Sequence, residues 1–198
     1  MRSFGQHPLT ATIVAGLLAL AACGGEQREL AGFPLAAAPA VAGVSLPELT
    51  KGGTPFALKA GSGELLLVYF GYTTCPDFCP ATLSNVNLAR RQLDDPSQVD
   101  FAMITVDPER DLPVLADYVT GFLADGHALG TDDPDALARA ADPFLVTYEV
   151  REVDGETQVG HSTLLYAVDD AGNVLLAWPP EVTVDDLAAD IEQLLEPE

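Results

Sequence analysis

Basic residues are scarce in this chain. Nine lysine and arginine residues stand against 30 aspartate and glutamate residues, which gives a formal net charge of −21. Because a surface of this sign repels nucleic-acid phosphates and anionic lipid headgroups, the composition argues against nucleic acid as a partner. Any membrane attachment then requires a lipid or an apolar anchor. Cations and basic partner proteins are favoured instead.

Sulfur-containing residues are also few, and the common hydrolase and nucleotide-binding motifs are absent from the sequence. Three cysteines are too few for a disulfide scaffold, and two methionines give no support to a methionine-rich metal site. The sequence has no G-x-S-x-G, Walker-type or dinucleotide-binding fingerprint, which leaves hydrolase and nucleotide-binding functions without a basis. With 198 residues and 48% hydrophobic content, the chain is predicted to form one domain with a buried core.

Residues 1–22 follow the order of a bacterial signal peptide. Arg2 precedes an apolar stretch from Ala11 to Ala22, which is shorter than the roughly 20 residues that span a membrane. The stretch ends in Leu20-Ala21-Ala22-Cys23-Gly24, which resembles a lipobox. We therefore expect residues 1–22 to be a lipoprotein signal peptide and Cys23 to be acylated. The alternatives are an uncleaved anchor or an ordinary signal peptide followed by a chance cysteine.

An acylated Cys23 would place the protein on the extracytoplasmic face of a bacterial cell membrane, held there by its lipid anchor. Residues 23–43 are rich in alanine, glycine and proline and are predicted to form a tether. The folded domain is predicted over residues 44–198, with no internal repeat and no second domain.

The hydrophobic pattern of the domain alternates between strands and helices. It predicts, in chain order, a buried strand over 65–70, a helix over 80–93, a strand over 99–106, a helix capped by Asp111, a helix over 134–141 capped by Asp133, hairpins over 146–159 and 162–178, and a helix from Thr183 to Leu195. This order is typical of an α/β, thioredoxin-like fold: a central mixed β-sheet flanked by helices, with a β-hairpin near the C-terminal third.

Cys75 and Cys79 lie directly after the first predicted strand, where the chain enters a helix. The unpaired N–H groups and the dipole at the start of a helix are expected to lower the pKa of both thiols. The i,i+4 spacing is expected to place both sulfurs on one helical face. Because a thiolate is both a nucleophile and a soft metal ligand, the pattern predicts a redox-active disulfide or a metal site. A structural disulfide or two inert buried thiols is the alternative.

Three blocks of sequence resemble a known family. The run from Gly71 to Pro80, GYTTCPDFCP, is similar to the copper-site motif of the SCO (SenC/PrrC) family. The likeness continues through Thr105 to Asp111 (TVDPERD) and Gly160 to Tyr166 (GHSTLLY), and covers roughly residues 44–195. The resemblance implies a thioredoxin-like protein that binds copper and helps to assemble cytochrome c oxidase.

The resemblance also implies the ligands. Cys75, Cys79 and His161 would coordinate one copper ion per chain, a donor set that suits Cu(I) and accepts Cu(II) with one further ligand. It implies an outer-shell role for Asp107, which could equally be a turn residue. His127 is expected in a solvated loop. Structural zinc is disfavoured because such sites use four protein ligands.

Two functions are compatible with these residues. The first is a membrane-tethered, non-enzymatic metallochaperone whose partner is the copper-centre subunit of cytochrome c oxidase, with other copper chaperones or thiol reductants as further partners. The second is an enzyme, a thiol–disulfide oxidoreductase that reduces the copper-ligand cysteines of that subunit. A copper or redox sensor is a third alternative. His161 discriminates between them, because thiol exchange does not require it.

Overall fold

The computed structural model describes residues 28–36 and 39–196, so the predicted signal peptide and Cys23 lie outside the described residues. The strands are β1 (Ser45–Glu48), β2 (Thr54–Ala57), β3 (Leu65–Gly71), β4 (Val99–Thr105), β5 (His127–Leu129), β6 (Tyr148–Val153), β7 (Glu156–His161), β8 (Leu165–Val168) and β9 (Val174–Trp178). The helices are α1 (Phe78–Arg90), α2 (Pro108–Asp111), α3 (Leu115–Phe122), α4 (Pro134–Ala141) and α5 (Val184–Leu195), with 3-10 turns η1 (Leu49–Lys51), η2 (Pro96–Gln98) and η3 (Asp142–Phe144).

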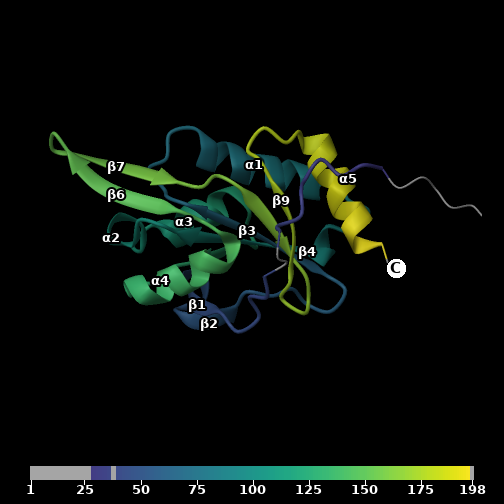
Figure 1. The fold of residues 1–198 in the computed structure, drawn as a ribbon, viewed down its shortest axis with the longest axis horizontal. Coiled ribbons are helices and arrows are strands. Elements are labelled where there is room, and N and C mark those ends of the chain that lie inside the picture. The colour runs from purple at the N-terminus through teal and green to yellow at the C-terminus, as the bar shows by residue number, and fades with distance from the viewer. Residues whose placement is uncertain (1–27, 37–38, 197–198) are drawn as a thin grey trace, which may run out of the picture.

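A seven-stranded mixed sheet forms the centre of the molecule, in the order β2-β1-β5-β4-β3-β8-β9. Strands β3, β4 and β5 run parallel to one another, and the remaining neighbours are antiparallel. Strands β6 and β7 form a separate two-stranded sheet that extends from one end of the molecule (Figure 1). The predicted central mixed sheet, its flanking helices and the C-terminal hairpin are confirmed.

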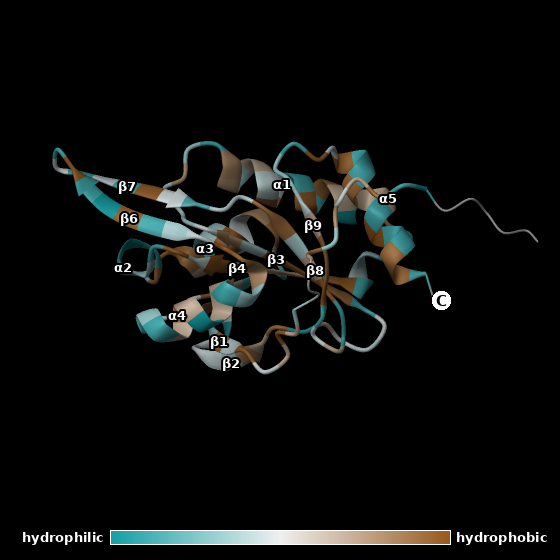
Figure 2. Ribbon diagram, in the orientation of Figure 1, coloured by the Kyte–Doolittle hydropathy of each residue, from teal (hydrophilic) through white to brown (hydrophobic). Residues whose placement is uncertain are grey.

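The sheet separates two layers of hydrophobic core. Successive side chains of a strand point to opposite faces, so Leu67 and Tyr69 of β3 pack with α1, α3 and α5, whereas Val68 and Phe70 pack with α4. All residues of β3 are buried, as expected for the centre of a sheet covered on both sides. Figure 2 shows hydrophobic residues along the inner strands and a largely hydrophilic β6.

Several predicted elements are confirmed by local contacts. The Asp133 side chain accepts a hydrogen bond from the Asp135 N–H at the start of α4. Thr183 and Asp186 cap α5 reciprocally, with a 3.1 Å bond from the Asp186 N–H to the Thr183 hydroxyl and a 2.7 Å bond back to the Asp186 carboxylate. The predicted turn at Asp154-Gly155 joins β6 to β7, and both residues have a positive φ.

Other elements depart from the prediction. Asp111 does not cap a long helix: it ends the short α2, its side chain is fully buried, and α3 begins only at Leu115. The helix predicted over 80–93 is α1 and begins earlier, at Phe78. Strands β1, β2 and β5 were not predicted, because each has only three or four residues and no long hydrophobic run distinguishes them.

Part of the segment predicted as a tether packs against the domain. Phe33 and Ala177 of β9 exchange two backbone hydrogen bonds of 2.9 Å, and Val41 is fully buried in the core. The packed structure therefore begins before the predicted boundary at residue 44. Within residues 28–36 and 39–196, no helix is both long enough and apolar enough to cross a membrane.

Candidate metal centre

The two cysteines lie beyond the carboxyl end of β3. Cys75 belongs to the turn that precedes α1, and Cys79 lies in the first turn of that helix. The Cys79 N–H donates a 3.4 Å hydrogen bond to the Cys75 sulfur, which thus accepts from one of the unpaired amides at the helix start. The expectation that both sulfurs occupy one helical face is wrong, since Cys75 precedes the helix. The two sulfurs approach one another because the turn folds back on the helix start.

His161 is the last residue of β7, so the protruding hairpin extends two residues beyond its predicted end at residue 159. Its Nδ1 lies 2.8 Å from the Ser162 carbonyl oxygen. A carbonyl can only accept, so Nδ1 carries the proton and Nε2 is left with a free lone pair. Burial lowers the pKa of His161 below its usual value, despite hydrogen bonds that oppose the shift. The imidazole is therefore neutral at pH 7 and able to bind a metal.

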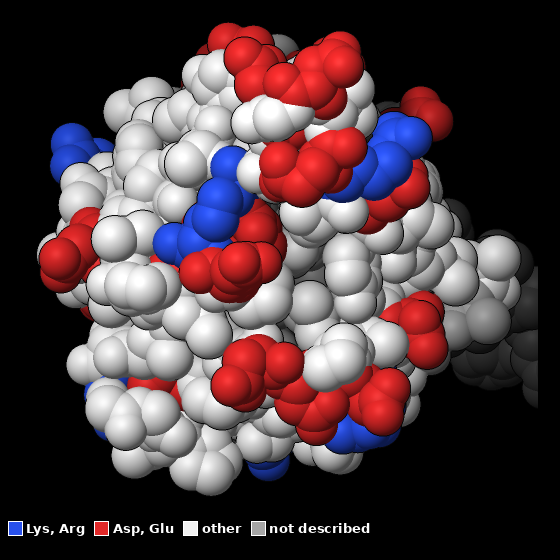
Figure 3. Space-filling model, turned by 90° about the vertical axis from the view of Figure 1, so that its left-hand side faces the viewer, with Lys and Arg blue, Asp and Glu red and all other residues white. Residues whose placement is uncertain are grey.

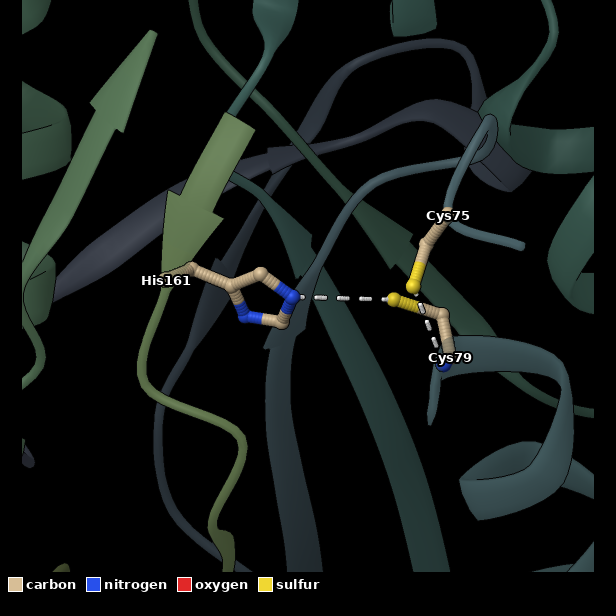
Figure 4. Close-up of side chains that lie close together, drawn as sticks. All are labelled: Cys75, Cys79 and His161. Carbon is tan, nitrogen blue, oxygen red and sulfur yellow. Dashed lines mark hydrogen bonds between the residues drawn. The ribbon is translucent and has the colours of Figure 1, made fainter. Parts of the chain in front are cut away.

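The structure brings these three predicted residues together (Figure 4). The Cys79 sulfur lies 3.9 Å from His161 Nε2, and the ligand atoms of Cys75, Cys79 and His161 all lie within 4.8 Å of one another. Both thiols are free rather than joined by a disulfide. Two sulfurs and one imidazole nitrogen form the soft, three-coordinate set that suits Cu(I). Among the described residues no fourth histidine, cysteine or carboxylate joins the group, as a structural zinc site would require.

Cys79 is the more deeply buried of the two cysteines. Its side chain is fully buried, and this burial raises the pKa of Cys79 to about 12, although hydrogen bonds partly oppose the shift. The expectation that the helix start would lower the thiol pKa is therefore wrong for Cys79. Without a metal, this sulfur carries a proton at neutral pH.

Aromatic side chains enclose the group. The Tyr69 hydroxyl donates a 3.6 Å hydrogen bond to the Cys79 sulfur. The rings of Tyr69 and Tyr72 stand nearly perpendicular to the His161 ring, with centroids 6.2 and 5.4 Å away. Beside His161, a hollow of about 430 Å³ opens at the base of the β6–β7 hairpin. Its lining residues are Thr147, Tyr148, Glu149, Gly160 and His161. Two tyrosines therefore lie against the ligand group, and the hollow beside His161 gives access to it.

Asp107 is buried, and its carboxylate forms an ion pair with Arg110. Within the described part of the chain, no hydrogen bond joins it to Cys75, Cys79 or His161. The predicted outer-shell role of Asp107 therefore stays a prediction.

Asp111 is a positioning residue that sequence reasoning missed. One oxygen of its buried carboxylate accepts from the Thr73 N–H at 3.0 Å and the Thr105 hydroxyl at 2.6 Å, and the other accepts from the Thr73 hydroxyl at 2.5 Å. These bonds hold the turn that carries Cys75 against the end of β4. The only sequence signal was an aspartate in the TVDPERD block, which the helix-cap interpretation explained differently.

His127 does not lie in a solvated loop, as the sequence suggested. It opens β5, is only 8% exposed, and its Nδ1 lies 2.8 Å from a Glu48 carboxylate oxygen. The prediction failed because β1, which supplies Glu48, was not recognised. His127 belongs to a separate polar contact and is not part of the cysteine–histidine group.

The comparison with known sequences supports the resemblance. The family model described as SCO1/SenC matches residues 48–196. An SCO2-like protein of Rickettsia prowazekii is 33% identical over 118 residues, in an alignment that covers 57% of this chain and 57% of that protein. The chain thus spans less than two thirds of the length of that curated relative.

Solved structures agree with the fold. The apo Sco1 protein of Thermus thermophilus superposes with a TM-score of 0.72 at 28% identity, and the match covers 86% of this chain and 99% of that one. ScoI of Bradyrhizobium japonicum, solved with copper bound, gives a TM-score of 0.65 at 28% identity, covering 82% of this chain and 98% of that one. The predicted thioredoxin-like fold is confirmed.

Proposed function

Because the chain belongs to the SCO1/SenC family, we propose that it is a copper metallochaperone whose ligands are Cys75, Cys79 and His161. The observation that carries this proposal is the convergence of the three ligand atoms within 4.8 Å. They come from the turn before α1, from α1 itself and from the end of β7. Nothing in a thiol-exchange reaction requires the third group. A soft metal ion explains its presence, and a copper-bound relative of the same fold supports copper as that metal.

Copper is the cargo in this proposal. Cys79 gives up its proton on binding, His161 already presents a free lone pair, and the hollow beside His161 leaves a side from which an acceptor can approach. The proposed acceptor is the copper-centre subunit of cytochrome c oxidase, as the family resemblance implies. The hairpin end of the molecule displays patches of acidic side chains (Figure 3), which would favour a basic docking surface on such a partner.

The proposed location is the extracytoplasmic face of a bacterial membrane, with Cys23 as the lipid-anchored residue. Metabolic labelling with a fatty acid tests this location. Label on the wild-type protein that disappears in Cys23→Ser is the expected result. Label that persists in Cys23→Ser, or no label on the wild type, contradicts the anchor.

A thiol–disulfide oxidoreductase is the second candidate, favoured by one observation: both thiols are free and lie within reach of each other. One cysteine would attack the partner disulfide and the other would resolve the mixed disulfide. This reaction uses the same two sulfurs as copper binding. Substitution of His161 separates the two, since it removes a copper ligand but no thiol.

The deciding experiment is copper titration of the reduced, soluble chain from Gly24 onward. Cu(I) and then Cu(II) are added anaerobically to the wild type, Cys75→Ser, Cys79→Ser and His161→Ala, with His127→Gln as the matched control. We expect one copper per chain, lost with either cysteine, sharply weakened with His161→Ala and unchanged in the control. If His161→Ala binds copper as tightly as the wild type and the protein rapidly reduces a disulfide peptide, the chaperone function is contradicted and the oxidoreductase function is favoured.

The partner requires its own test. Cells that lack the protein and grow at limiting copper should assemble little active cytochrome c oxidase, and added copper should restore it in part. Full oxidase activity at limiting copper contradicts the proposed acceptor.

A further inference from the structure

A buried tyrosine hydroxyl contacts one of the candidate copper ligands. Tyr69 lies on β3 at the centre of the sheet, paired with Met103 on β4 and Leu165 on β8. Its side chain is fully buried on the face that packs against α1, and its hydroxyl donates a hydrogen bond of 3.6 Å to the Cys79 sulfur.

This contact is held rigidly on both sides. The Tyr69 backbone is fixed by hydrogen-bonded strands on either side, and Cys79 is fixed in the first turn of α1. Gly71 leaves room between them: a Cβ there would lie 2.7 Å from a Tyr69 ring carbon and 2.9 Å from the Cys79 sulfur. The strands and the helix therefore fix the backbone of both partners, and the missing side chain at Gly71 lets the ring and the sulfur approach. The hydrogen bond is thus built into the fold rather than into a mobile loop.

We infer that Tyr69 is a positioning residue of the metal centre, whose hydroxyl aims the Cys79 sulfur at His161 and raises the reduction potential of bound copper. The inference rests on the proposed copper function. A hydrogen bond to a thiolate stabilises its negative charge, so the sulfur donates less electron density to the metal. Cu(II) depends on that donation more than Cu(I) does. Tyr69 therefore favours the Cu(I) form.

Tyr166 provides a matched control. It lies on the neighbouring strand β8, is only 1% exposed, and its ring packs against Phe70 and Phe144 on the other face of the sheet. Its hydroxyl is buried with no hydrogen-bond partner among the described residues. Tyr69→Phe and Tyr166→Phe thus each remove one buried hydroxyl from the sheet, but only the first removes a bond to a ligand.

The experiment compares the full chain as wild type, Tyr69→Phe and Tyr166→Phe. The readouts are the thiolate-to-copper absorption of the Cu(II) form, the reduction potential, and the Cu(I) and Cu(II) dissociation constants. We expect the Tyr69→Phe variant to have its thiolate-to-copper absorption band at longer wavelength than the wild type and to have a lower reduction potential. The ratio of the Cu(I) dissociation constant to the Cu(II) dissociation constant should rise roughly three- to tenfold. Tyr166→Phe should match the wild type in all three.

The outcomes separate this inference from the proposed function. A wild type that binds no copper overturns both. A wild type that binds copper while Tyr69→Phe keeps its band and potential overturns the inference alone. Unfolding of each metal-free variant is measured in parallel. If Tyr69→Phe does not fold, 3-fluorotyrosine at position 69 provides the test. Its hydroxyl is a stronger hydrogen-bond donor, so the absorption band should move to shorter wavelength and the reduction potential should rise. An unchanged band and potential would overturn the inference.

Discussion

At the scale of single residues, the metal centre depends on a position that carries no side chain. Gly71 ends β3 beneath the Cys79 sulfur, and a Cβ there would approach Tyr69, Cys79 and the Met103 methyl group at 2.7, 2.9 and 3.1 Å. Real Cβ atoms do not tolerate the first two distances, so a larger residue must displace the ring or the sulfur. The glycine sets where the sulfur can lie.

Gly71→Ala should therefore weaken Cu(I) binding and lower the free energy of unfolding by about 1–3 kcal/mol, as overpacking of a core does. Gly160→Ala is the control: Gly160 precedes His161, yet a Cβ there meets nothing within 4 Å. Cu(I) competition with a chromogenic chelator and urea unfolding provide the two measurements. Equal behaviour of the two variants would contradict the steric argument.

Protonation of Cys79 makes copper binding pH-dependent. Burial raises the pKa of Cys79 to about 12 and lowers the pKa of His161, so from pH 7.5 to 8.5 the cysteine is protonated and the histidine is neutral. Binding must release the Cys79 proton, and the apparent Cu(I) affinity should rise at least about tenfold per pH unit. Chelator competition at three pH values measures this slope. An affinity independent of pH would show that Cys79 is already a thiolate or is not a ligand.

At the scale of elements, the centre is assembled by a strand end, a helix start and a hairpin, held together by Asp111. This buried carboxylate connects the end of β4 at Thr105 to the cysteine turn at Thr73. The ligands can therefore be disturbed by a residue that never touches them. Asp111 acts through the turn and not through the metal.

Asp111→Ala should lower the free energy of unfolding by about 2–4 kcal/mol, because three hydrogen bonds to a buried charge are lost. It should also weaken Cu(I) binding by loosening the turn. Asp117→Ala, which removes an exposed carboxylate from α3, should change neither quantity appreciably. Thermal unfolding of the metal-free proteins, followed by Cu(I) competition, tests both effects. Unchanged copper binding in a destabilised Asp111→Ala would restrict its role to stability.

The sequence predicts those elements and contacts that depend on residues close together in the chain. Strand β3, helix α1 and the Asp154-Gly155 turn leave short-range patterns, and all were predicted. The ligand set came from the family's motif blocks, because no local rule brings His161 to Cys75 across 86 residues of chain. The Glu48–His127 contact and the hydrogen bonds between Asp111 and Thr73 join segments that are far apart in the sequence. Those contacts exist only once the sheet order is known.

At the scale of the whole molecule, the N-terminal segment is part of the domain. Asp190 of α5 is fully buried and accepts hydrogen bonds from Trp178 Nε1 at 2.8 Å, Gly32 N–H at 2.9 Å and Ala31 N–H at 3.2 Å, and it forms an ion pair with Arg28. The backbone hydrogen bonds between Phe33 and Ala177 also cover β9, which is an edge strand of the sheet. The segment therefore satisfies a buried charge and closes an edge strand.

A chain that begins at residue 44 should have a free energy of unfolding about 3–5 kcal/mol lower than one that begins at residue 28, because the Asp190 carboxylate loses its partners Arg28, Ala31 and Gly32 and the core loses Val41. Asp186→Asn is the control: this exposed carboxylate also contacts Arg28, and asparagine can still accept the hydrogen bond from Thr183, so the loss of the charge should cost little. Fluorescence of Trp178, the single tryptophan, follows urea unfolding and reports directly on Asp190. Equal midpoints for the two chain lengths would contradict a structural role for the segment.

The Asp190 contacts also limit how far the domain can move from its attachment point. With Cys23 as the proposed anchor, only the five residues 23–27 separate the lipid from the first packed residue, and they reach at most about 18 Å. The packed chain begins beside α5, while the hairpin that carries His161 lies toward the other end of the long axis (Figure 1). The domain would then stand close to the bilayer on its α5 end and present copper to acceptors at a restricted height above the lipid.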